Sequence, residues 1–281
     1  MRLAYLGTPQ VAVPPLQALV DRGHDVALVV TRADKRRGRG GALVPSPVKA
    51  VALELGLPVT SDIDAVLALA APAALGVVVA FGRLIKPHVL AQVPMVNVHF
   101  SLLPRWRGAA PVERAILAGD DRTGVCLMEV EEGLDTGGVY RRAEVAIGPD
   151  ETADELRARL VDAAVPLLLD ALEDGLGMPE PQKGEATYAD KIDPAEREID
   201  WTRPAVGVHR LVRIGDAWTT FRGKRLKVWR TALVATGAGV TVPAGDGPIE
   251  VLEVQPEGKP RMAARAWANG AHVTEVDRLP S

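Results

Sequence analysis

Apolar and polar positions alternate with two different periods along the first two-thirds of the chain. Apolar residues with helical spacing fill residues 11–22 and stop at Gly23, between strand-like runs at 2–6 and 25–31. This order predicts a βαβ unit at the start of the chain. The continuous apolar run at 76–80 is typical of a central parallel strand, which is buried on both faces.

Strand-like and helix-like segments continue to alternate after this start. The pattern predicts later strands at 96–100, 124–130 and 139–147, and further helices at 47–55, 111–118 and 152–173. We therefore expect an α/β, Rossmann-like fold with an open, mostly parallel sheet and helices on both faces.

The pattern changes after a turn-rich stretch at 175–183. Short strand-like runs separated by Gly and Pro follow at 218–222, 225–233, 240–242 and 249–255. They predict a small OB-like β-barrel, shortened around 237–246. We expect a catalytic domain at 1–185, a linker at 186–200 and a second domain at 201–281.

Composition is consistent with two globular domains. The length of 281 residues suits two cores, and 47% hydrophobic with 25% charged residues excludes a disordered or fibrous chain. No export signal and no apolar run of the roughly 20 residues that a membrane span needs is visible, so we expect a soluble, cytoplasmic protein. The single cysteine, Cys126, lies among apolar residues and is expected to be buried.

Two common cofactor types are not indicated. The turn Gly7-Thr8-Pro9 follows the first strand but lacks the second and third glycines of a dinucleotide-binding motif, which argues against NAD. The five histidines are scattered, without cysteine or carboxylate partners at ligand spacing, so no metal site is expected.

The strand expected at 96–100 carries two polar side chains of interest. Asn97 and His99 are two residues apart and therefore point to the same face of a strand. An amide can donate a hydrogen bond to a developing oxyanion, and an imidazole can transfer protons near neutral pH. The alternative is that both satisfy local backbone groups, but their position at the carboxyl end of a strand favours a site.

Asp135 lies in a glycine-rich, acidic loop at 131–137 after another expected strand. Its carboxylate could orient His99 or accept a proton in the same crevice. Taken alone, the loop favours the alternative of a turn aspartate that bonds its own backbone.

Three short elements together resemble the 10-formyltetrahydrofolate-dependent formyltransferases. They are Asn97-Val98-His99, Ser101-Leu102-Leu103-Pro104 and Asp135-Thr136-Gly137, in this order and separation. The resemblance implies that Asn97, His99 and Asp135 are catalytic and that Ser101, Leu102, Leu103 and Pro104 line the folate site. It also implies 10-formyltetrahydrofolate as the formyl donor, without a covalent enzyme intermediate.

A basic segment at 34–49 points to one branch of this family. It resembles the tRNA-contacting loop of the members whose acceptor is initiator methionyl-tRNA, and the resemblance implies tRNA contacts from Lys35, Arg36, Arg37, Arg39 and Lys49. Clustered cations with neighbouring glycines suit a close approach to phosphates. The alternative is a solvated basic turn.

The second domain is expected to add to the same surface. The segment from Trp201 to Arg230 contains eight Lys and Arg residues and only one acidic residue, Asp216, although the whole chain has a net charge of −3. Such a localised basic face suggests a polyanionic partner. We expect a monomer that binds folate and initiator tRNA and no membrane.

The sequence departs from the family pattern at two places. Phe100 stands where a small residue is usual, which predicts a changed pocket shape, and 213–218 lacks the usual proline-rich stretch. Two alternatives therefore stay open: an N-formyltransferase acting on nucleotide amino sugars, and a non-catalytic relative that binds folate or RNA.

Overall fold

A computed structural model describes residues 1–37, 41–69, 74–273 and 279 of the chain. Contacts between Cα atoms divide the chain into two compact units. The first unit comprises Met1–Pro111, Arg122–Ala146 and Arg157–Ala189, and the second comprises Val112–Asp121, Ile147–Leu156 and Asp190–Ser281. The second unit thus draws segments from three parts of the chain. The domain limits 1–185, 186–200 and 201–281 stay a prediction.

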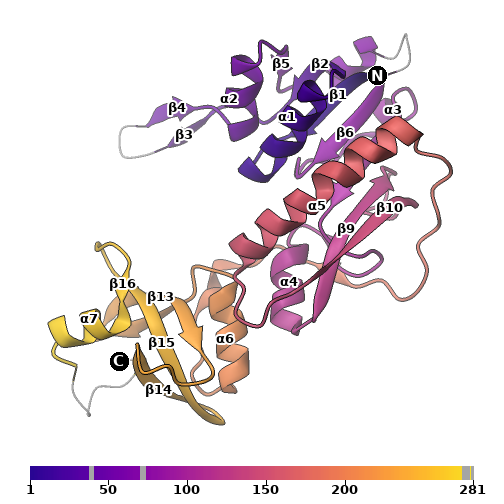
Figure 1. The fold of residues 1–281 in the computed structure, drawn as a ribbon. Coiled ribbons are helices and arrows are strands. Elements are labelled where there is room, and N and C mark those ends of the chain that lie inside the picture. Colours follow the sequence, from indigo (N-terminus) through magenta and orange to yellow (C-terminus); the bar gives the residue numbers. More distant parts are fainter. Residues whose placement is uncertain (38–40, 70–73, 274–278, 280–281) are drawn as a thin grey trace. The chain divides into compact units, whose positions relative to one another are not determined.

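The first unit is built on a seven-stranded sheet with the order β10-β9-β7-β6-β1-β2-β5 (Figure 1). Its strands are β1 (Arg2–Gly7), β2 (Asp25–Val30), β5 (Val59–Thr60), β6 (Leu75–Val79), β7 (Met95–His99), β9 (Arg122–Glu129) and β10 (Val139–Ala146). The five strands from β7 to β5 are parallel, whereas β9 is antiparallel to both β7 and β10. The predicted mostly parallel sheet is confirmed.

Helices connect these strands. They are α1 (Val13–Asp21), α2 (Pro47–Glu54), α3 (Pro87–Leu90), α4 (Pro111–Ala118) and α5 (Ala153–Asp174), with 3-10 turns η1 (Gln10–Ala12) and η2 (Asp64–Leu69). The start of α2 shows why the sequence begins a helix where it does: the Ser46 hydroxyl accepts the Lys49 N–H, and Pro47 occupies the first turn, where its missing N–H costs nothing. Among the described residues, no helix is long and apolar enough to cross a membrane.

Strand β6 lies at the centre of the sheet and is buried along its whole length. Val78 belongs to an apolar core with Leu6, Val30 and Met95 from the neighbouring strands. Burial on both faces explains the uninterrupted apolar run in the sequence. Because β7 pairs in parallel with β6, the two strands end at the same edge of the sheet, where β7 terminates at His99.

The basic segment forms a hairpin that the sequence did not predict. Strands β3 (Lys35–Arg37) and β4 (Ala42–Val44) pair in antiparallel fashion, with Lys35 opposite Val44 (Figure 1). The hairpin extends away from the central sheet. Ala42, Leu43 and Val44 are exposed, so no burial imposed an alternating pattern on the sequence.

The second unit contains a five-stranded antiparallel sheet with the order β12-β13-β15-β14 and β16 paired to β15. The four predicted strands are confirmed as β12 to β15, whereas β16 was not predicted. Its strands are β12 (Trp218–Phe221), β13 (Lys224–Ala232), β14 (Val240–Ala244), β15 (Gly247–Pro256) and β16 (Met262–Ala263). It also contains η3 (Pro194–Arg197), α6 (Ala205–Arg213) and α7 (Ala264–Gly270), of which α6 and α7 were not predicted.

Two short strands complete the first unit. β8 (Arg107–Gly108) pairs in parallel with β11 (Tyr188–Ala189) and brings residues far apart in the sequence side by side. Gly108 has φ +122°, and a Cβ atom there would lie 2.9 Å from the Ala189 carbonyl oxygen. Glycine is therefore required for this close pairing.

Candidate active site

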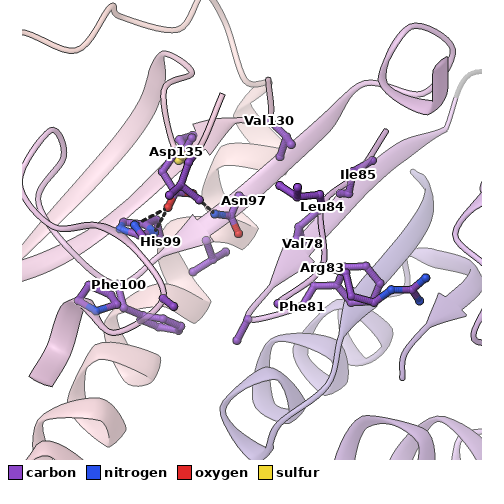
Figure 2. A pocket seen from close by; sticks show the side chains of 18 of the residues that line it. Val78, Phe81, Arg83, Leu84, Ile85, Asn97, His99, Phe100, Val130 and Asp135 are labelled. Carbon is purple, nitrogen blue, oxygen red and sulfur yellow. Dashed lines mark hydrogen bonds and ion pairs between the residues drawn. The ribbon is translucent and has the colours of Figure 1, made fainter. Parts of the chain in front are cut away.

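Three polar side chains meet at one wall of a cavity of about 580 Å³ in the first unit. Asn97 and His99 come from β7, and Asp135 comes from the loop that follows β9. Figure 2 shows the three side chains pointing toward one another. The structure therefore brings together the three residues that the sequence singled out, and it places Asn97 and His99 on the same face as predicted.

His99 is buried, with 5% of its side chain exposed, and it lies between two acceptors. Its Nε2 is 2.9 Å from the Trp106 carbonyl oxygen, and its Nδ1 is 3.6 Å from Asp135 Oδ2. A carbonyl oxygen can only accept, so Nε2 carries a hydrogen. Nδ1 faces the Asp135 carboxylate on the other side of the ring.

The Asp135 carboxylate reaches across the site to other elements. Oδ2 accepts the Gly108 backbone N–H at 2.8 Å, and Asn97 Nδ2 donates to Oδ1 at 3.5 Å. Asp135 itself has φ +50°, a left-handed conformation that aspartate tolerates better than most residues. These contacts favour a site aspartate over a turn aspartate that serves its own loop.

The opposite part of the cavity is mostly apolar, although Arg83 also lines it. Phe81, Leu84 and Ile85 follow β6 and line the cavity together with Val130, which follows β9 (Figure 2). The sequence did not predict this wall. Leu84 is 77% exposed, but exposure is visible only in the folded chain, and a single leucine after a strand does not indicate a ligand surface.

Residues 101–104 do not appear among those that line the cavity. The buried Ser101 hydroxyl donates to the Arg105 carbonyl oxygen at 2.6 Å, and Leu103 packs against Cys126 and Met128 behind the strand. Folate contacts from Ser101, Leu102, Leu103 and Pro104 stay a prediction. Phe100, by contrast, lines the cavity beside His99.

The basic residues of the hairpin differ in their surroundings. Lys35 and Arg36 are exposed on β3. Lys49 lies on α2 and forms an ion pair with Asp34, with Nζ 2.8 Å from Oδ2. Arg39 and the side chain of Arg37 lie outside the described residues. The tRNA contacts of all five stay a prediction.

Some cations of the second unit have structural partners. Arg213 is buried, and its guanidinium donates to the Glu151 and Gly148 carbonyl oxygens. Other cations lie over aromatic rings: the Arg225 guanidinium is 4.0 Å from the Trp218 ring centre, and that of Arg261 is 3.3 Å from the Trp229 ring centre. Arg213 therefore does not contribute to the predicted basic face, whereas Arg225 and Arg261 are exposed.

The described residues contain no group of three or more His, Cys, Asp or Glu side chains that could hold a metal ion. Cys126 is fully buried, as expected, in the strand next to His99. Burial raises the pKa of its thiol, which keeps it protonated, although a backbone hydrogen bond at Leu103 opposes the shift. A protonated, buried thiol is a poor nucleophile.

Sequence comparison matches both parts of the chain to one family. Residues 1–172 match the family described as formyl transferase, and residues 191–272 match the formyl transferase C-terminal domain. The chain belongs to the formyl transferase family. It is 43% identical over 306 residues to a methionyl-tRNA formyltransferase of Symbiobacterium thermophilum, with 97% of this chain and 93% of that protein covered.

Solved structures of other formyltransferases share the fold. An N-formyltransferase from Helicobacter canadensis, in complex with folinic acid and dTDP-3-aminofucose, superposes with a TM-score of 0.69 at 17% identity, over 90% of this chain and 98% of that one. A methionyl-tRNA formyltransferase from Clostridium thermocellum gives 0.64 at 17% identity, over 91% and 98%. At 17% identity, these likenesses show the fold alone.

Proposed function

We propose that this formyltransferase moves the formyl group of 10-formyltetrahydrofolate to the α-amine of initiator methionyl-tRNA. The observation that carries formyl transfer is the meeting of Asn97, His99 and Asp135 at the wall of one cavity. The tRNA acceptor is supported by the 43% identity to a methionyl-tRNA formyltransferase over nearly the whole of both chains.

Formyl transfer requires only direct attack of the acceptor amine on the formyl carbon. An α-amino group has a pKa of about 8, so an appreciable fraction of the amine is neutral at physiological pH and can attack the formyl carbon. A tetrahedral oxyanion forms, and its collapse breaks the bond between the formyl carbon and N10 of the folate. The amine nitrogen loses one proton and N10 gains one, so no covalent intermediate with the enzyme is required.

Each member of the trio has a role in this step. The Asn97 amide and the Nδ1–H of His99 donate to the oxyanion, which is stabilised most strongly in a site shielded from water. Asp135 orients the His99 ring and relays the proton that leaves the amine. Asp135 Oδ2 lies 3.6 Å from His99 Nδ1, which is longer than a hydrogen bond and leaves the Nδ1–H available to a bound oxyanion.

The cavity suits the donor as well as the reaction. The apolar wall formed by Phe81, Leu84, Ile85 and Val130 offers a surface for an aromatic ring system, next to the polar trio. We assign the folate ring to this wall and its formyl-bearing nitrogen to the side of Asn97. The bulky Phe100 narrows the cavity on the side of His99.

We assign the tRNA body to two basic surfaces. One is the β3–β4 hairpin, where Lys35 and Arg36 are exposed. The other is the second domain, in which Arg225 and Arg261 lie over tryptophan rings. Cations and aromatic rings together suit phosphates and unstacked bases.

We infer further that the enzyme acts as a monomer in the cytoplasm, and light scattering on the purified chain would test the oligomeric state.

One assay separates the candidate functions. The enzyme is given 10-formyltetrahydrofolate with charged initiator tRNA and, in parallel, with a nucleotide amino sugar. We expect formylation of the tRNA and none of the sugar. Formylation of the sugar alone would favour the amino-sugar enzymes that share the fold, and no turnover of either acceptor would favour a binding protein.

A further inference from the structure

Gln182 links the loop that carries Asp135 to strand β8. Its Nε2 donates to the carbonyl oxygens of Asp135 and Gly137, at 2.8 Å each. Its Oε1 accepts from Nε and Nη2 of Arg107, at 3.1 and 2.6 Å. Both amide hydrogens and both carbonyl lone pairs of the side chain are therefore used.

This link runs parallel to a direct one. Arg107 precedes Gly108, whose backbone N–H donates to the Asp135 carboxylate. Strand β8 therefore holds Asp135 in two ways: Gly108 binds the side chain, and Arg107 holds the backbone through Gln182. Trp106, one residue earlier, accepts the hydrogen bond from His99. Three consecutive residues thus fix both partners of the His99–Asp135 pair.

Most residues of the loop at 131–136 are exposed. Glu131, Glu132 and Gly133 are exposed, and Leu134 is 53% exposed, so few apolar contacts oppose its opening. The left-handed backbone at Asp135 adds a conformational cost. A displacement of the carboxylate by about 1 Å is enough to cost about 100-fold in rate in an enzyme that depends on orientation.

We propose that Gln182 is a positioning residue that keeps Asp135 aimed at His99. Gln182 does not line the cavity and acts through the Asp135 loop. The kinetic part of this inference rests on the proposed function, whereas the structural part is independent of which acceptor the enzyme uses.

The first test compares Gln182→Ala and Gln182→Glu with Lys183→Ala. Alanine removes the link, and glutamate keeps the bonds to Arg107 while placing a charge beside two carbonyl oxygens. Lys183 is the exposed neighbour and serves as the matched control. We expect kcat to fall about 10- to 100-fold in both Gln182 variants, with the KM for 10-formyltetrahydrofolate within about twofold of wild type. Unchanged kcat, or a loss confined to folate binding, would overturn the proposal.

A double-mutant cycle tests whether Gln182 acts through Asp135. In an Asp135→Asn background the carboxylate charge is already gone, so Gln182→Ala should lower the single-turnover rate by less than about twofold. An equal loss in both backgrounds would mean that Gln182 acts independently of Asp135 and would reject the proposal.

A measurement without turnover keeps the two hypotheses apart. Amide hydrogen exchange in peptides that cover 131–138 should be faster in both Gln182 variants than in wild type and Lys183→Ala. If exchange rises while wild type formylates neither acceptor, the positioning role stands and the proposed function fails. If exchange in the loop does not change, the positioning role is wrong even in an active enzyme.

Discussion

Asp135 combines three contacts that one carboxylate can make only in a narrow range of positions. It lies beside His99, accepts the Gly108 N–H and receives the Asn97 amide. An asparagine at this position has nearly the same shape and can still accept a hydrogen bond, but it carries no charge. The substitution therefore separates the charge of Asp135 from its packing.

We expect Asp135→Asn to lower the single-turnover formylation rate by about 100- to 10,000-fold, the range for loss of a positioned proton-transfer group. Folate affinity should change little, because the apolar wall is untouched. Rates come from rapid quench and affinity from calorimetry, with the exposed Asp162→Asn as the matched control. A rate close to wild type would remove Asp135 from the mechanism.

The residue scale also shows what a sequence can reveal about a site. Asn97 and His99 were predicted to share a face because side chains two apart on a strand must do so. The groups that hold them are the Trp106 carbonyl and the Gly108 N–H, which belong to the backbone. Backbone partners leave no side-chain signature, so only the structure could identify them.

Helices and strands were predictable where burial imposed a regular pattern of apolar residues on the sequence. The apolar run of β6 and the alternation around it follow from a central parallel sheet. Helix α6 was missed because buried polar residues interrupt its apolar face: His209 and Arg213 lie beside Val208 and Val212. Strands β8 and β11 are too short to show a period, and each forms only because the other is present.

The β8–β11 pair gives a prediction at this scale. Gly108→Ala would place a Cβ atom 2.9 Å from the Ala189 carbonyl oxygen in a backbone conformation that alanine rarely adopts. Strands β8 and β11 should separate, and the backbone N–H of residue 108 should move away from the Asp135 carboxylate. We therefore expect kcat to fall by about 100-fold. Steady-state kinetics and thermal unfolding are measured together.

The control is Gly207→Ala in α6, where the new Cβ atom would lie 4.0 Å from the nearest heavy atom. Inside a helix this change should leave kcat unchanged and raise stability by up to about 1 kcal/mol. Equal activity of the two variants would show that the Asp135 contact does not depend on β8.

Helix α6 also carries a buried histidine whose protonation affects stability. His209 Nε2 lies 3.1 Å from the Pro149 carbonyl oxygen, which only accepts, and Nδ1 lies 2.9 Å from the Thr231 hydroxyl. Burial lowers the pKa of His209; the Pro149 and Asp150 oxygens oppose this shift, and the Arg213 charge reinforces it. The native state therefore favours the neutral ring.

The direction of the pH dependence follows from this shift. In the unfolded chain His209 is protonated once the pH falls below its ordinary pKa of about 6.5. In the native state its pKa is lower, so the ring stays neutral to a lower pH. Stability from this group is complete above about pH 6.5 and is lost as the pH falls from there to the lower native pKa. We expect the melting temperature to decline between pH 7 and 5 more steeply in wild type than in His209→Gln. The exposed His88→Gln should keep the wild-type slope, and identical slopes in wild type and His209→Gln would contradict the assignment.

At the scale of the whole molecule, charge is distributed unevenly. The chain has a net charge of −3, so a general attraction to a polyanion is absent and tRNA must be held by local clusters. We propose that the β3–β4 hairpin, with Lys35 and Arg36 exposed, is one such cluster. Each cation that binds a phosphate releases a counterion, so the affinity for tRNA falls in a predictable way as the salt concentration rises.

Reversing both charges should therefore change tRNA binding and nothing else. For Lys35→Glu/Arg36→Glu we expect the KM for initiator tRNA to rise about 10-fold or more at physiological salt, with kcat at saturating tRNA and the KM for folate unchanged. The slope of log KM against log salt concentration should become shallower by about one for each phosphate that the variant no longer binds. The variant Arg22→Glu/Arg142→Glu reverses two exposed cations elsewhere on the first unit and controls for net charge. If both double variants weaken tRNA binding to the same extent and with the same salt slope, net charge rather than the hairpin governs the acceptor.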